Sequence, residues 1–165
     1  SCPLNNMKST RIHERLQEAK SESEPLDYDH ENQYIGIEWS NKSNKKVNHH
    51  IEPHHDIAHS QHHTTLHPPG ERLPNNHPLR DHIGKEVTGH VTHTAKDDDI
   101  QAARVKLPKG IDQAHNRDHP HITISRGKKI PAQQSNNMLQ NTQGERLSRH
   151  IPITGRVRVF NTLGK

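Results

Sequence analysis

The nine residues from His119 to Gly127, HPHITISRG, are the stretch on which the expected fold depends. Its centre is rich in β-branched residues, and such a run is typical of a β-strand. Side chains of a strand alternate between its two faces, so His121 and Thr123 project together. Ile122 and Ile124 then point to the opposite face. The pattern predicts a strand with one face on a core and the other on a cleft.

A second stretch, QHHTTLHPP at residues 61–69, carries the same order of histidine, any residue, threonine and aliphatic residue. On a strand, His63 and Thr65 would share one face, while Leu66 would anchor the opposite face in the core. The intervening Thr64 is a weak core residue, so this strand is less clearly marked than the first. The sequence therefore predicts two strands that present the same pair of polar groups.

The chain contains eighteen histidines, so the bare His-x-Thr pattern also arises by chance. His62 with Thr64 satisfies it in an alternative register, which the sequence leaves open. A third copy, His90 with Thr92, is followed by His93 instead of an aliphatic residue. The interpretation of a paired site rests mostly on the PHITIS stretch and on the placement of the two motifs on separate strands.

Around these motifs, short β-rich runs alternate with turn residues, which predicts an α+β domain with a largely antiparallel sheet. Strands are expected at residues 33–40, 62–66, 86–95, 100–108, 121–125 and 151–160. A helix is expected at 41–52, where Ser40 or Asn41 is a suitable N-cap and Val47 and Ile51 have helical spacing. A helical turn is expected within 78–85, and residues 111–120 are expected to form a loop.

The N-terminal residues 1–32 are polar and lack sustained periodicity, so we expect a short helix near 10–20 followed by a linker. Residues 33–165 would then form the folded domain. Only 26% of the chain is hydrophobic and 2% aromatic, which predicts a thin core and long polar loops. The chain is long enough for one domain or for two small lobes with a shared core.

The formal net charge of +4 favours polyanionic partners such as RNA. A single cysteine, Cys2, excludes an internal disulfide and a zinc ribbon. No apolar run reaches the length of a membrane span and no signal-peptide pattern opens the chain, so we expect no membrane partner and a cytoplasmic or nuclear location. P-loop, GxSxG and catalytic-cysteine patterns are also absent from the sequence, which excludes those enzyme classes.

Two imidazoles that converge on one cleft can act as general base and general acid in a single displacement. One takes a proton from the attacking oxygen, and the other gives a proton to the leaving oxygen. A threonine hydroxyl two residues further on can donate a hydrogen bond to a phosphoryl oxygen, where charge develops in the transition state. Ring-opening of a cyclic phosphate needs these groups and no metal or other cofactor.

The duplicated pattern resembles the two-histidine (2H) phosphoesterase superfamily, which includes RNA cyclic phosphodiesterases and the enzymes once called 2'-5' RNA ligases. Residues 84–108, 119–139 and 151–160 are similar to the RNA-repair branch of that group, and the resemblance covers 33–160. It implies a bilobal fold with one motif per lobe, largely antiparallel sheets and flanking helices around a central cleft. It also implies that His63 and His121 are the acid and base, and that Thr65 and Thr123 bind phosphate.

Three residues after the second motif are expected to help bind substrate. Ser125 is expected beside His121 and Thr123 by alternation, and Arg126 and Lys128 at the cleft mouth could hold flanking phosphates. A solvated basic turn explains the two cations equally well. The expected substrates are RNA 3' ends or cyclic-phosphate nucleotides, and we expect a monomer or a domain of a larger RNA-repair protein.

Two other functions remain open from the sequence. A non-catalytic RNA-binding module would use the same cleft without turnover and would bind more weakly at high salt. A histidine-rich metal-binding protein is the other alternative, because His50/His54 and His55/His59 are spaced i, i+4, a spacing that can hold a metal on a helix. Pro53 interrupts that helix, so no metal ligands are assigned. Tyr34 is expected in the core, and Asn136 in a turn or helix cap.

Overall fold

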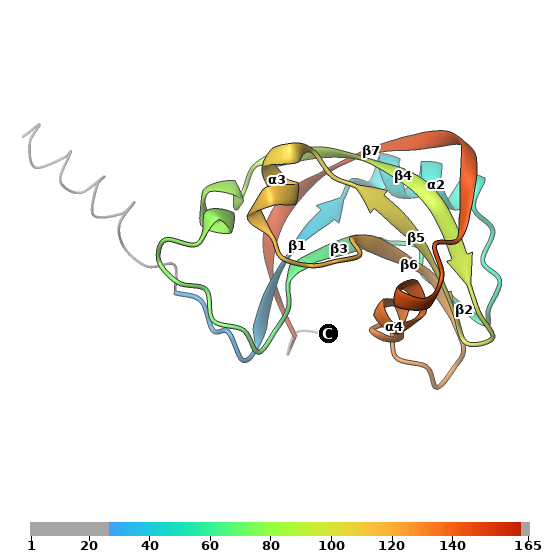
Figure 1. The fold of residues 1–165 in the computed structure, drawn as a ribbon, viewed down its shortest axis with the longest axis horizontal. Helices are drawn as coiled ribbons and strands as arrows, with labels where there is room; N and C mark the ends of the chain where they lie inside the picture. The colour runs from blue at the N-terminus through green and yellow to red at the C-terminus, as the bar shows by residue number, and fades with distance from the viewer. Residues whose placement is uncertain (1–26, 163–165) are drawn as a thin grey trace, which may run out of the picture.

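The computed structural model describes residues 27–162 of the chain (Figure 1). The helix expected near residues 10–20, with most of the polar N-terminal segment, lies outside this range. The described residues form an α+β fold with a seven-stranded sheet, in the strand order β2-β6-β5-β4-β7-β1-β3. All six strand pairings are antiparallel, which confirms the expected class and sheet type. The division into two lobes stays a prediction.

The strands are β1 (Gln33–Trp39), β2 (Ile57–Ala58), β3 (His63–His67), β4 (Glu86–Lys96), β5 (Ile100–Lys106), β6 (His121–Arg126) and β7 (Glu145–Asn161). The helices are α2 (Asn41–His50), the 3-10 helix η1 (Pro78–His82), α3 (Lys109–Ala114) and α4 (Gln134–Asn141). Each expected strand is present, and β7 begins six residues before the expected start. α2 also forms as expected, with the Ser40 hydroxyl accepting a hydrogen bond from the backbone of Ser43.

The sheet curves strongly, and this curvature brings distant strands together. β3 lies at one end of the strand order and β6 lies next to the other end, yet the two strands contact each other. Figure 1 shows β3 and β6 near the middle of the molecule, with β7 arching over the sheet. The two strands that carry the His-x-Thr motifs are therefore neighbours in space.

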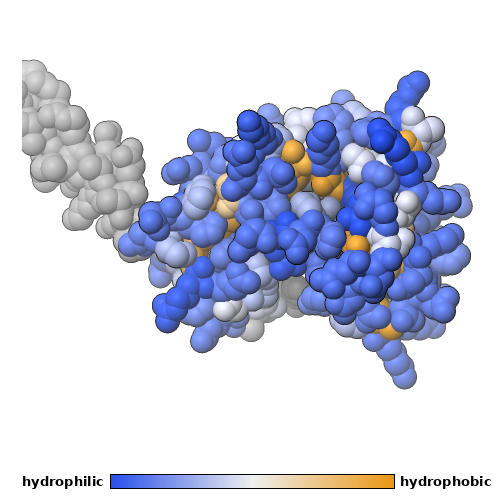
Figure 2. All heavy atoms as spheres, viewed as in Figure 1, coloured by the Kyte–Doolittle hydropathy of each residue, from blue (hydrophilic) through white to orange (hydrophobic). Residues whose placement is uncertain are grey.

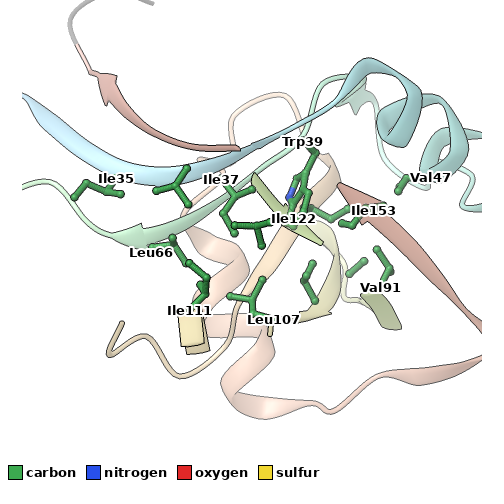
Figure 3. Close-up of a cluster of buried hydrophobic side chains, with 14 of the residues drawn as sticks. Ile35, Ile37, Trp39, Val47, Leu66, Val91, Leu107, Ile111, Ile122 and Ile153 are labelled. Atoms are coloured by element: carbon green, nitrogen blue, oxygen red, sulfur yellow. The ribbon is translucent and has the colours of Figure 1, made fainter. Parts of the chain in front are cut away.

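The main hydrophobic core lies on the inner side of the curved sheet (Figure 3). It contains Ile37 and Trp39 from β1, Leu66 from β3 and Ile122 from β6, all at most 2% exposed. A smaller cluster lies under α4, where Met138 and Leu139 pack on Ala102 of β5 and its neighbours. Figure 2 shows a mostly hydrophilic face on which apolar residues form only small spots.

Two β-bulges decide which face certain side chains occupy. Val91 and His93 of β4 pair with the adjacent β5 residues Val105 and Arg104, so the strand gains one residue there. Val91 consequently faces the main core while His93 faces the opposite side. A second bulge lies between Thr123 and Ser125 of β6, with the same effect on their alternation.

Two helices lie where the sequence predicts loops. α3 falls within the loop expected at residues 111–120, and α4 falls within an Asn/Gln-rich stretch. Asparagine is a weak helix former, so packing supplies what propensity does not. The buried residues of α4, Ser135, Met138 and Leu139, have the i, i+3, i+4 spacing of one helical face.

Candidate active site

Both His-x-Thr motifs open onto a single cavity of about 200 Å³. His63 and Thr65 reach it from β3, and His121 and Thr123 reach it from β6. We call it the two-histidine cavity. The sequence predicts the pairing of residues within each strand, and the curvature of the sheet brings the two pairs to the same place.

The opposite face of each motif strand is buried, as alternation predicts. Ile122 is fully buried and Ile124 is 2% exposed, while Thr64 and Leu66 are fully buried. The Thr64 hydroxyl accepts a hydrogen bond of 2.9 Å from the indole N–H of Trp39. This contact explains how a polar residue is accommodated in a core position.

The alternative register of the first motif does not present its two side chains to the cavity as a pair. The Thr64 hydroxyl is hydrogen-bonded to Trp39 and does not line the cavity, whereas His62 is buried in the cavity wall. The His62 ring donates from Nε2 to Oδ1 of Asn48 at 2.8 Å, and the Asn48 amide donates to the Ser60 carbonyl. Burial lowers the pKa of His62 to about 4. The pair that faces the cavity is His63 with Thr65.

His121 is a partly buried histidine with a fixed orientation. Its Nδ1 donates to the backbone carbonyl of His119 at 2.7 Å, so Nε2 of the neutral ring carries the lone pair. Burial is the largest effect on its pKa and lowers it to about 4, against the opposing effect of the His119 hydrogen bond. The charge of Arg117 lowers the pKa further. At neutral pH, His121 is therefore an uncharged proton acceptor.

His63 occupies a more exposed place beside two aromatic rings. The ring centroids of Tyr34 and Phe160 lie 5.0 Å apart and the rings are nearly parallel, at 12°. The His63 ring lies 6.0 Å from Tyr34 and 5.5 Å from Phe160. A Cβ on Gly36 would lie only 3.3 Å from the Phe160 ring and 2.7 Å from the Thr64 carbonyl, so glycine is needed there.

The threonine of the second motif is held by a hydroxyl from α4. Thr123 Oγ1 lies 3.0 Å from Oγ of Ser135, which is fully buried. Since Ser135 belongs to the first turn of α4, the helix packs on β6 directly behind the cavity wall. Asn136, the next residue of α4, also lines the cavity.

Arg117 is a cavity residue that the sequence did not single out. Its guanidinium donates to Oδ1 of Asn136 at 3.2 Å, which holds the cation in the cavity wall. Tyr34 and His59 line the same cavity. The one sequence feature that points to Arg117 as a cavity residue is its position in a polar loop, four residues before His121. The sequence predicts structural roles for Tyr34 and Asn136, and both residues also border the cavity.

Ser125 does not lie where alternation placed it. The bulge on β6 turns it to the face opposite Thr123, and it is fully buried. Its hydroxyl lies 2.6 Å from Oε1 of Gln101 and accepts hydrogen bonds from the backbone of His54 and His55. Ser125 therefore holds the segment before β2 and is not a lining residue of the cavity.

Arg126 and Lys128 differ from each other in placement. Arg126 donates from Nε to Nε2 of His59 at 3.1 Å and from Nη1 to the Ile130 carbonyl. It therefore supports a histidine of the cavity wall without lining the cavity. Lys128 is exposed in the turn after β6, outside the lining residues. Their role in binding substrate stays a prediction.

The histidine-rich segment does not gather a metal site within residues 27–162. No group of three or more histidine, cysteine, aspartate or glutamate side chains with metal-binding geometry is present there. α2 ends at His50, so neither the His50/His54 nor the His55/His59 pair lies on a helix. His55 instead contacts the Asp97 carbonyl through Nε2. The helical spacing that suggested a metal clamp is therefore not realised.

This chain is similar in fold to a known protein structure. A scan against protein-family models gives no match, and a search of curated proteins gives none either. Among solved structures, the chain is similar to one described as the crystal structure of a fungal RNA kinase, with a TM-score of 0.50 and 16% sequence identity. The match covers 84% of this chain and 43% of that chain, so this chain spans less than half of the matched structure.

Together these findings define an α+β protein with an antiparallel sheet and a two-histidine cavity. At 16% identity, the structural match concerns the fold alone. None of the helices within residues 27–162 has the length and apolar character that a membrane span requires.

Proposed function

We propose that this protein is a metal-independent phosphoesterase of the 2H type that acts on RNA ends and opens a 2',3'-cyclic phosphate. One observation carries the proposal: His63, Thr65, His121 and Thr123, from two separate strands, line one cavity. This is the arrangement that general acid–base catalysis at one phosphorus atom requires. We further propose that it acts as a monomer or as a domain of a larger RNA-repair protein.

The environment of His121 supports its assignment as the general base. Its pKa of about 4 keeps it neutral at pH 7, with the lone pair on Nε2. In this proposal Nε2 takes a proton from water while the water oxygen bonds to phosphorus. The bond from phosphorus to one ribose oxygen breaks, and His63 gives its proton to that oxygen. The product is a phosphomonoester, and the two histidines return to their starting states by proton exchange with solvent.

The charge that develops on the phosphoryl oxygens needs donors that are already in place. Thr65 and Thr123 supply hydroxyls, and Thr123 is oriented by its contact with Ser135. The guanidinium of Arg117, held by Asn136 in the cavity wall, supplies a positive charge. In this proposal the side chains supply both the proton transfers and the charge stabilisation, so the reaction needs no metal.

RNA is the proposed substrate for two reasons. The chain has a net charge of +4, which favours a polyanion. The structure that it resembles in fold is described as a fungal RNA kinase. Both reasons concern the class of substrate, and neither identifies a particular RNA.

The test uses a short RNA with a 2',3'-cyclic phosphate end, incubated with the protein in the presence and absence of EDTA. We expect turnover that survives EDTA and falls about 100-fold or more in both His63→Ala and His121→Ala. His90→Ala is the matched control, because His90 belongs to the third His-x-Thr copy and is exposed on β4 outside the cavity. It should retain the activity of the unmodified protein.

Three results would contradict the proposal. Loss of turnover with EDTA would point to a metal-dependent reaction. Full turnover in His63→Ala or His121→Ala would remove that residue from the chemistry. RNA binding without turnover would favour a non-catalytic RNA-binding module.

A further inference from the structure

Four residues lie in one row across four strands of the sheet and start at the candidate general base. The strand register pairs His121 of β6 with Arg104 of β5, Arg104 with His93 of β4, and His93 with Arg146 of β7. Residues that are directly opposite on neighbouring strands project from the same face. We call His121, Arg104, His93 and Arg146 the basic row. With strands about 4.8 Å apart, it extends roughly 15 Å from the cavity.

The bulge on β4 is what completes the row. Without the additional residue, His93 would share a face with Val91 and would point into the main core. With it, His93 faces the same side as Arg104 and His121. The row therefore depends on an irregularity of the sheet and is not visible in the sequence.

The positive charge of the row is not neutralised by carboxylates. The pKa of His93 is lowered first by burial and then by the charges of Arg104, Arg146 and His150. No acidic group opposes these effects. The two ion pairs of the described residues, His115–Asp112 and Arg158–Glu38, involve no member of the row. At neutral pH the positive potential of the row comes from its two arginines, Arg104 and Arg146, because burial and neighbouring cations lower the pKa of both histidines.

The two arginines of the row differ in how they are held. Arg104 is fixed, because its guanidinium donates to the backbone carbonyls of Leu139, Thr142 and Gln143 and contacts Nδ1 of His119. Arg146 is exposed, as is Arg149 further along β7. The fixed cation adjoins the cavity, and the exposed cations lie where a flexible polyanion can reach them.

A second cavity offers the main alternative path away from His63, and its charges are balanced. It has a volume of about 510 Å³ and shares His63 with the two-histidine cavity. Arg156 within it lies opposite both Glu38 and Glu86, and Arg158 forms an ion pair with Glu38. A phosphate backbone gains little there, whereas the basic row has no such compensation.

The geometry points to the basic row as the binding track for the RNA strand that leads to the reacting end, with phosphates over His93 and Arg146. This inference rests on the proposed function, because it starts from a phosphate held between His63 and His121. It adds that the substrate is a polynucleotide whose strand crosses β5, β4 and β7. A cyclic mononucleotide would use the cavity alone.

The experiment compares a 2',3'-cyclic mononucleotide with a single-stranded RNA of about ten nucleotides ending in the same cyclic phosphate. Arg146→Gln should lower the ratio of kcat/KM for the RNA to that for the mononucleotide by about fivefold at 0.1 M salt. The slope of log Kd for RNA against log salt should change by about 0.7, the value for one phosphate contact on a single strand. Arg146→Glu should have a larger effect in the same direction.

Arg156→Gln is the matched control, because it removes an arginine from the same strand where Glu38 and Glu86 balance its charge. It should keep both the ratio and the salt slope. Equal effects of Arg146→Gln and Arg156→Gln, or no effect of Arg146→Glu on either measurement, would overturn the inference. Turnover of the mononucleotide would then still stand as support for the proposed function. Absence of turnover with both substrates would instead refute the function itself.

Discussion

β3 and β6 carry the same four-residue pattern but place it in different surroundings. β6 is paired on both sides, with β2 and β5, and its His121 is partly buried and bonded to a backbone carbonyl. β3 is a terminal strand, paired with β1 alone, and its His63 is exposed beside two aromatic rings. A motif repeated in sequence thus gives two histidines with different access to water. This difference supports the proposed roles, in which the partly buried His121 accepts a proton and the exposed His63 donates one.

The largest effect is expected when the acid and base roles of the two histidines are tested with an activated phosphodiester, whose leaving group is p-nitrophenolate. Such a group leaves without receiving a proton, so an acid catalyst contributes little. His63→Ala should lose far less activity on this substrate than on the cyclic phosphate. His121→Ala should lose about 100-fold or more on both, because water must still be activated. The measurement is kcat/KM for both variants on both substrates.

The result has a clear reversal. If His121→Ala were rescued by the activated leaving group and His63→Ala were not, the assigned roles would be exchanged. If neither were rescued, the two histidines would not be divided between acid and base.

A smaller effect is expected on stability in acid, because His121 and His62 both have a pKa of about 4 in the folded protein. In the unfolded chain a histidine takes up its proton near pH 6.5. Above that pH the two histidines are uncharged in both the folded and the unfolded state. As the pH falls toward 4, they take up protons in the unfolded state first, so the free energy of unfolding decreases. Each histidine accounts for roughly 3 kcal/mol of this loss between pH 7 and pH 4.

Urea unfolding at the two pH values measures the effect. His121→Asn should lose about 3 kcal/mol less between pH 7 and pH 4 than the unmodified protein. His90→Asn, at an exposed position on β4, should show the same loss as the unmodified protein. If His121→Asn lost as much free energy of unfolding between pH 7 and pH 4 as the unmodified protein, the His121 ring would take up its proton as readily in the folded state as in the unfolded chain.

Individual residues show how much of the core and of the candidate site the sequence predicts. Alternation within a strand correctly assigns Ile122 and Ile124 to the core and His121 and Thr123 to the opposite face, because it depends on local backbone geometry. It fails at Ser125, because a bulge depends on how the partner strand pairs.

The remaining parts of the site come from tertiary structure. Four of the eight residues of α4 are serine or asparagine, which are weak helix formers, and burial of Met138 and Leu139 against the sheet stabilises the helix. Arg117 lies in a loop, and its place in the cavity depends on Asn136 of that helix. Neither position follows from local spacing, so the sequence indicates the two histidines and threonines but not the cation beside them.

The smallest expected effects separate the two registers of the first motif through its adjacent threonines. Thr64→Val keeps the shape of the side chain but removes the acceptor for the buried Trp39 indole N–H. It should lower the free energy of unfolding by about 1 to 2 kcal/mol, with turnover retained. Thr65→Val should lower turnover by about tenfold, as expected for one hydrogen bond to a charged group, with little change in stability. Urea unfolding and kcat/KM on the cyclic-phosphate RNA measure both variants, and the opposite outcome would assign the catalytic register to His62 and Thr64.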